Sequence, residues 1–131
     1  MNHERSCGAV LFTVRDGIPY YVLVQENYYG FPKGHMEAGV DAVIIGDFRK
    51  VDRYLLKYKQ DTEKTVVYFL AYFEGQEIHY QREELNGAVL VPYEEAVRLV
   101  THVRLKRVLR EAHRVVLRWI AKKNAGNSGS H

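Results

Sequence analysis

The first two thirds of the chain consist of short apolar, β-branched runs separated by polar segments rich in glycine and proline, a pattern that predicts strands. The Asp16-Gly17 pair lies between two such runs and predicts a β-hairpin. The longest run is apolar at successive positions, so we expect it to be buried on both faces, at the centre of a sheet. The expected strands span residues 8–14, 20–25, 43–48, 65–73 and 88–91.

The last third of the chain changes from the period of a strand to that of a helix. Residues 93–100 predict a short helix, and a longer one runs from about 103 to about 121. The apolar side chains of the longer segment follow one stripe, and its arginines fall on the other side. Strands first and an amphipathic helix last predict an α+β fold in residues 1–123. We expect the small, polar residues 124–131 to be a disordered tail.

The composition favours one compact domain without a membrane span. The chain has 131 residues, of which 47% are hydrophobic, and its net charge is +3. Neither a signal peptide nor a long apolar stretch is apparent, so we expect a cytoplasmic protein. The single cysteine, Cys7, excludes an internal disulfide, and its apolar neighbours predict a buried thiol.

The bases of the long helix raise the question of a nucleic-acid partner. Eight arginines and lysines lie between residues 103 and 123, against one acid, Glu111. Because they lie opposite a regular apolar stripe, we interpret them as a solvated face and expect no nucleic-acid partner. The oligomeric state stays open.

The run Phe31-Pro32-Lys33-Gly34-His35-Met36-Glu37-Ala38-Gly39 resembles the opening of the Nudix box, G-x5-E-x7-R-E-U-x-E-E-x-G-U, where U is aliphatic. The hairpin of residues 6–25, the strand 64–71, the segment 84–96 and the helix 99–112 are also similar to parts of the diadenosine-tetraphosphate hydrolase branch of the Nudix hydrolases. The resemblance covers nearly the whole chain in the right order. It implies an α/β/α sandwich around a mixed sheet.

The chain departs from the box pattern after Gly39. Val40 and the residues that follow it resemble the strand that comes after the box, so roughly 16 positions have no counterpart. These positions include the helix that carries the Arg-Glu-U-x-Glu-Glu run. The box helix is therefore absent from the sequence as it stands, and the order of residues cannot say whether the gap is natural.

The resemblance implies a metal site and a catalytic residue. The cofactor would be Mg²⁺, which Mn²⁺ can replace, and its ligands would be the backbone carbonyl of Lys33 and the carboxylate of Glu84. Glu84 would also be the catalytic residue, with Glu83 as the alternative if the register shifts by one. Read without the family, Lys33-Gly34 is a turn, and Glu84 is a surface charge.

The resemblance also implies contacts to a nucleotide. Lys33 and Gly34 would lie on its phosphate side, where Lys64 would offset charge on the polyphosphate chain. The aromatic candidates for the substrate site are Tyr68, Tyr28 and Tyr29, of which the last two could stack on a base. Each has a plainer interpretation, since lysines often cap strands and tyrosines often pack in cores.

Three functions therefore stay open. The first is Mg²⁺-dependent hydrolysis of a pyrophosphate bond in a nucleoside or dinucleoside polyphosphate, impaired if the chain lacks the box glutamates. The second is a Nudix-fold module that binds a nucleotide or a partner without hydrolysing it. The third is a pyrophosphohydrolase acting on RNA 5′ ends, which only the basic helix suggests.

Overall fold

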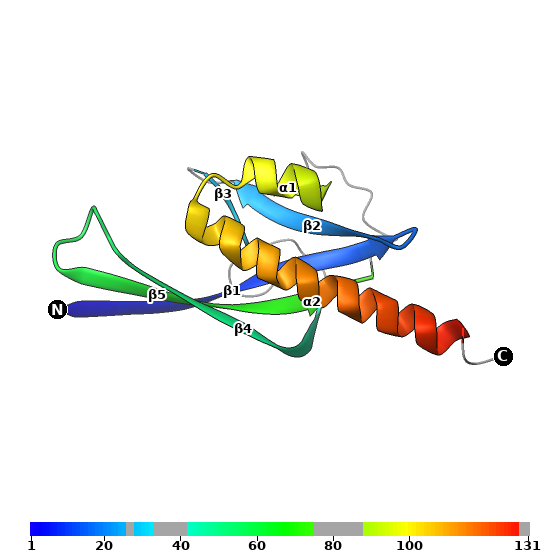
Figure 1. The fold of residues 1–131 in the computed structure, drawn as a ribbon. Coiled ribbons are helices and arrows are strands. Elements are labelled where there is room, and N and C mark those ends of the chain that lie inside the picture. The colour runs from blue at the N-terminus through cyan, green and yellow to red at the C-terminus, as the bar shows by residue number, and fades with distance from the viewer. Residues whose placement is uncertain (26–27, 33–41, 75–87, 129–131) are drawn as a thin grey trace.

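The structure, a computed structural model, describes residues 1–25, 28–32, 42–74 and 88–128. These described residues form six strands and two helices (Figure 1). They are β1 (Asn2–Arg15), β2 (Ile18–Gln25), β3 (Tyr29–Gly30), β4 (Val43–Leu55), β5 (Thr62–Tyr72), β6 (Ala88–Pro92), α1 (Tyr93–Leu99) and α2 (Val103–Ser128).

The six strands form one mixed sheet in the order β3-β2-β1-β5-β4, with β6 paired to β2. β1 and β5 run parallel, and the other pairs are antiparallel. The predicted hairpin is confirmed: Arg15 pairs with Ile18, and Asp16 and Gly17 both have positive φ, as in a two-residue type I′ turn. β5 lies between β1 and β4, so the prediction of an internal strand is also confirmed.

Two strands are longer than the sequence predicts. β1 begins at Asn2 instead of residue 8, and β4 continues to Leu55 instead of ending at residue 48. The added segments are rich in charged residues, which rarely signal a strand by themselves. They are extended because β5 lies between them and supplies backbone hydrogen-bonding partners along its whole length.

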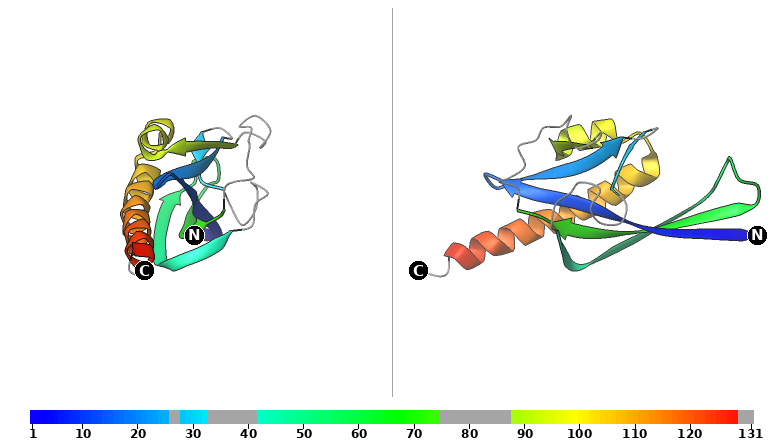
Figure 2. Two further views of the ribbon diagram at one scale, coloured as in Figure 1. Left: turned by 90° about the vertical axis from the view of Figure 1, so that its right-hand side faces the viewer. Right: turned by 180° about the vertical axis from the view of Figure 1, so that it is seen from behind.

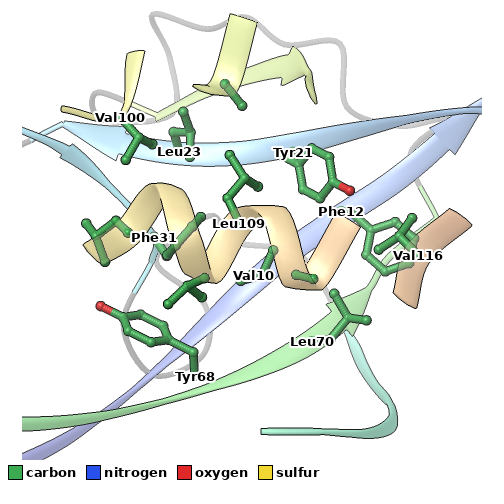
Figure 3. Close-up of a cluster of buried hydrophobic side chains, with 14 of the residues drawn as sticks. Val10, Phe12, Tyr21, Leu23, Phe31, Tyr68, Leu70, Val100, Leu109 and Val116 are labelled. Atoms are coloured by element: carbon green, nitrogen blue, oxygen red, sulfur yellow. The ribbon is translucent and has the colours of Figure 1, made fainter. Parts of the chain in front are cut away.

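Both helices pack on one face of the sheet, which we call the helix face (Figures 1 and 2). The core there consists of even-numbered residues of β1 and β5, which meet the apolar stripe of α2. In Figure 3, the Leu109 side chain of α2 lies among Val10 of β1 and Tyr21 and Leu23 of β2. The α+β fold with a mixed sheet is thus confirmed, although the described residues form two layers, without a helix on the second face.

Polar contacts tie the helices to the sheet. The Tyr21 hydroxyl on β2 lies 2.7 Å from Nδ1 of His113 on α2, and the Tyr93 ring of α1 stacks on the same imidazole at 3.7 Å. Lys50 of β4 donates to the Glu111 carboxylate of α2 at 3.0 Å. Burial lowers the pKa of His113, which outweighs the opposing effect of nearby Glu94.

The second face of the sheet carries a smaller apolar cluster. The residues buried there are Leu11 of β1, Val22 of β2, Ala71 of β5, Phe73 directly after β5, and Ala88 of β6. The predicted buried thiol is wrong: Cys7 is exposed. It occupies an odd position of β1, two residues ahead of this cluster, so its side chain points away from α2 and its core.

The edge strand β4 and the end of α2 also differ from the simple pattern. The pairing of β4 with β5 shifts register between Ile44 and Arg49, around Gly46, whose φ is +63°. α2 continues to Ser128, beyond its predicted end near residue 121 and into the predicted tail. No proline interrupts this segment, and adding a residue to an existing helix costs little. No described helix is long and apolar enough to cross a membrane.

Candidate functional site

The helix face divides into two halves along the strands. Under α2 it is apolar. Beyond the start of α2, the strands continue as an arm in which the aligned side chains are mostly polar (Figure 1). We call this second region the polar half and define it by Glu4, Ser6, Asp52, Tyr54 and Lys64. Strand pairing aligns Glu4, Lys64 and Tyr54 in one row and Ser6, Val66 and Asp52 in the next.

Lys64, a predicted phosphate contact, lies in the first row of the polar half. Its ammonium is 3.9 Å from a carboxylate oxygen of Glu4, and its side chain is 16% exposed. Glu4 also accepts a hydrogen bond from Lys59. That bond, with the charges of Lys59 and Lys64, lowers the pKa of the Glu4 carboxyl. Two ammonium groups therefore share one carboxylate, which leaves a local excess of positive charge.

An ion pair joins the polar half to the first turn of α2. Nε of Arg104 donates to Oδ2 of Asp52 at 3.0 Å, and Asp52 is almost fully buried. The Arg104 guanidinium also lies 4.3 Å from the centre of the Tyr54 ring, a cation–π contact. Burial, with Tyr28 and Asp52 nearby, raises the pKa of Tyr54, so its hydroxyl stays a neutral hydrogen-bond donor.

The two neighbouring tyrosines predicted to stack on a base occupy different surroundings. Tyr28 is 40% exposed, and its ring meets the His102 ring edge-on at 4.4 Å. Tyr29 begins the short strand β3 and packs against the main core. Only the Tyr28 ring therefore has substantial free surface for a ligand, and Tyr28 also lies close enough to Tyr54 to affect its titration.

Tyr68 lies on the border between the two halves. Its ring packs edge-on against Phe31 and covers Gly8, where an added Cβ would meet the ring at 2.8 Å. Burial and nearby Asp52 raise the pKa of Tyr68 far above its usual range. In Figure 3 the hydroxyl points to the margin of the apolar cluster. The ring thus serves packing, and only its hydroxyl edge is directed toward the polar groups.

The predicted metal ligands lie outside the described residues. These are the Lys33 carbonyl and the Glu84 carboxylate, and the phosphate-side residue Gly34 and the join between Gly39 and Val40 also lie there. Within the described residues, no group of three His, Cys, Asp or Glu side chains could hold a metal ion. The described part of the chain alone therefore does not provide a site that fits Mg²⁺.

Several residues of the polar half were not predicted from the sequence. Asp52 and Tyr54 belong to the part of β4 that lacks a strand pattern, and Arg104 was expected on the solvated side of the helix. Had β4 been recognised, its alternation would have placed Asp52 and Tyr54 on the face of Lys64, because alternate residues of a strand share a face.

Comparisons with solved structures identify the fold. The chain matches an Ap4A hydrolase from C. elegans with a TM-score of 0.69 and 19% identity, covering 88% of this chain and 99% of the other. It matches NrtR of Shewanella oneidensis, complexed with a 27mer DNA, with a TM-score of 0.62 and 14% identity. That match covers 85% of this chain and 61% of NrtR. RenU, a Nudix hydrolase of M. smegmatis, matches at 0.57 and 12%, covering 88% of each chain.

These likenesses define the class of fold: the chain has the Nudix fold. This confirms the fold that the sequence resemblance implied. At sequence identities of 12–19%, these structural matches establish the fold alone. No protein-family sequence model and no curated protein sequence matches the chain.

Proposed function

We propose that the chain binds a nucleoside polyphosphate at the polar half of the helix face, as a Nudix-fold domain related to enzymes that hydrolyse such compounds. One observation carries the proposal: Lys64 is paired across the sheet with Tyr54, whose ring contacts Arg104 and lies near Tyr28, at the end of the sheet that α2 does not cover. Cations beside an accessible aromatic ring suit a ligand that combines phosphates with a base.

Each group has a role that follows from its surroundings. Lys64 shares its carboxylate partner with Lys59, so its charge is only partly neutralised and can attract the phosphate chain. The exposed face of Tyr28 would stack on the base, and the neutral Tyr54 hydroxyl would donate a hydrogen bond.

We propose that hydrolysis is at most a minor activity of this chain. Mg²⁺, when bound by the Lys33 carbonyl and Glu84, would neutralise phosphate oxygens and lower the pKa of bound water. Two such ligands are few for this ion, which takes about six oxygens, and the box glutamates are missing. We therefore expect binding with little or no hydrolysis by this chain, and we assign no catalytic step to it.

Titration calorimetry with AMP, ADP and ATP tests the binding site. Lys64→Ala should weaken ATP binding more than AMP binding, because an ammonium acts on the summed charge of the phosphates. Tyr28→Ala should weaken all three by a similar factor, about 1–3 kcal/mol for a stacked base. The matched control is Lys57→Ala, an exposed lysine between β4 and β5. Equal losses for Lys57→Ala and Lys64→Ala would show that only the net charge matters.

Hydrolysis is tested separately, with diadenosine tetraphosphate and Mg²⁺ or Mn²⁺. We expect negligible turnover by the chain as it stands. Insertion of a glutamate-containing box helix between Gly39 and Val40 should restore turnover. Robust hydrolysis by the unaltered chain would show that catalytic groups lie elsewhere.

A further inference from the structure

The outward face of α2 carries a row of arginines. Arg107, Arg110, Arg114 and Arg118 are all exposed, and we call them the arginine stripe. At 100° per residue they fall within an arc of about 80°, and at 1.5 Å per residue they extend over about 16 Å. Figure 2 shows α2 at the margin of the molecule, with the sheet on one side of it only.

Among the described residues, this stripe has no negative partner. Glu111 is the only acid on α2, and its carboxylate is already bound by Lys50 of β4. Arg104, at the start of the helix, is paired with Asp52. No carboxylate within the described residues forms an ion pair with any of the four stripe arginines.

The spacing makes the stripe unfavourable for the isolated helix. Arg110 and Arg114, and Arg114 and Arg118, are four residues apart, where like charges repel by about 0.2–0.5 kcal/mol per pair. Arg107 and Arg110 are three apart, with the same sign of effect. An anion bound along the stripe would relieve this repulsion.

The chemistry of the side chains indicates which anion fits. All four are arginines, whose planar guanidinium groups donate two parallel hydrogen bonds to a phosphate. Successive phosphates of a duplex strand rise about 3.4 Å along the helix axis, so a stripe of about 16 Å is long enough to meet several phosphates. A membrane surface fits less well, because the apolar side of α2 is already packed on the sheet and cannot enter a bilayer.

We propose that the arginine stripe of α2 binds the phosphodiester backbone of a nucleic acid, without reading its sequence. The stripe is separate from the polar half, so this binding does not depend on the proposed nucleotide site. It also reverses the expectation, drawn from the sequence, that these bases are only a solvated face. The sequence alone could not show that Lys50 forms an ion pair with Glu111, the single acidic residue of α2.

The test measures fluorescence anisotropy with labelled oligouridylate and oligothymidylate that carry 5′-hydroxyl ends. Such ends lack a pyrophosphate group, and excess ADP should not displace the oligonucleotide. Arg110→Gln with Arg114→Gln should weaken binding by about tenfold at low salt and should lower the salt slope by about 1.4, because each lost contact to a single strand is worth about 0.7. The matched control is Arg49→Gln with Arg53→Gln, two exposed arginines four residues apart on β4.

The outcomes separate cleanly. A loss confined to the stripe variant supports the proposal. Equal losses in both double variants, or no loss in either, would overturn it, because binding would follow the net charge or be absent. Tighter binding to vesicles of phosphatidylcholine and phosphatidylserine than to either oligonucleotide would overturn it in favour of a membrane. The stripe variant should unfold at the same or a slightly higher temperature, since it removes like-charge repulsion.

Discussion

Strands β1, β4 and β5 run through both halves of the helix face with the same alternation of side chains, yet the two halves differ in chemistry. Under α2, Val10 and Leu70 are fully buried. Farther along the same strands, the equivalent positions are Glu4 and Lys64. The difference follows from where α2 begins, because a side chain that a helix covers must be apolar or paired. One half is therefore expected to carry stability, and the other to carry binding.

The strongest test of this comparison exchanges one side chain in each region. Leu109→Ala should destabilise the fold by about 2–5 kcal/mol, because Leu109 is fully buried between α2 and the sheet. Lys64→Ala should cost no more than about 1 kcal/mol, the loss of a partly buried aliphatic stem and of a screened ion pair. Urea unfolding followed by circular dichroism measures both. Comparable losses would mean that the two halves are one structural unit.

The border between the halves should tolerate less change than the polar half itself. Gly8→Ala adds a Cβ that would lie 2.8 Å from Cε1 of Tyr68, so the ring must move away from Gly8 and Phe31. Overpacking of this kind costs about 1–3 kcal/mol. Thermal unfolding of the variant measures the loss. Ser6→Ala, one row farther out, is the control and should be close to neutral, since its hydroxyl has no hydrogen-bond partner among the described residues.

The ion pair that joins the two halves should contribute modestly. Arg104 is 40% exposed, so solvent screens its attraction to Asp52. A double-mutant cycle with Asp52→Asn and Arg104→Gln should give a coupling free energy of about 0.5–1 kcal/mol. A coupling near zero would mean that the geometry of the pair does not persist in solution.

The smallest expected effect is a pH dependence in the apolar half. His113 has a lowered pKa in the fold because of its burial, so folding favours its neutral form. This contribution is complete above the unfolded pKa of about 6.5 and is lost as the pH falls through the lower folded pKa. Unfolding free energies between about pH 7.5 and 5 should therefore decrease toward acid more steeply than in His113→Gln. Identical slopes would exclude His113 as the cause.

The sequence predicts the helices and strands whose hydrophobic residues follow a clear period. It misses the segments that become extended only because they pair with a neighbouring strand. The Asp16-Gly17 turn, the apolar strand β5 and the stripe of α2 all follow local rules. The charged ends of β1 and β4 become strands only by pairing with β5.

The candidate site follows the same division. Lys64 and the tyrosines were found through a family resemblance, and the fold that this resemblance implied is confirmed. Asp52 and Arg104 are distant in sequence and meet only when α2 packs on β4. Local pattern could not bring them together, because nothing in either segment specifies which strand a helix will cover.

The register shift in β4 has a consequence for how the molecule behaves among its own copies. A long edge strand offers unpaired backbone groups to any other extended chain, which is a route to aggregation. Here the break at Gly46 divides the ladder into a short piece at Val43–Ile44 and a longer one from Arg49 to Leu55. Arg49 and Arg53 project from the longer piece into solvent. A second copy that paired through the same Arg49–Leu55 segment would bring these arginines against its own, and this repulsion disfavours such pairing.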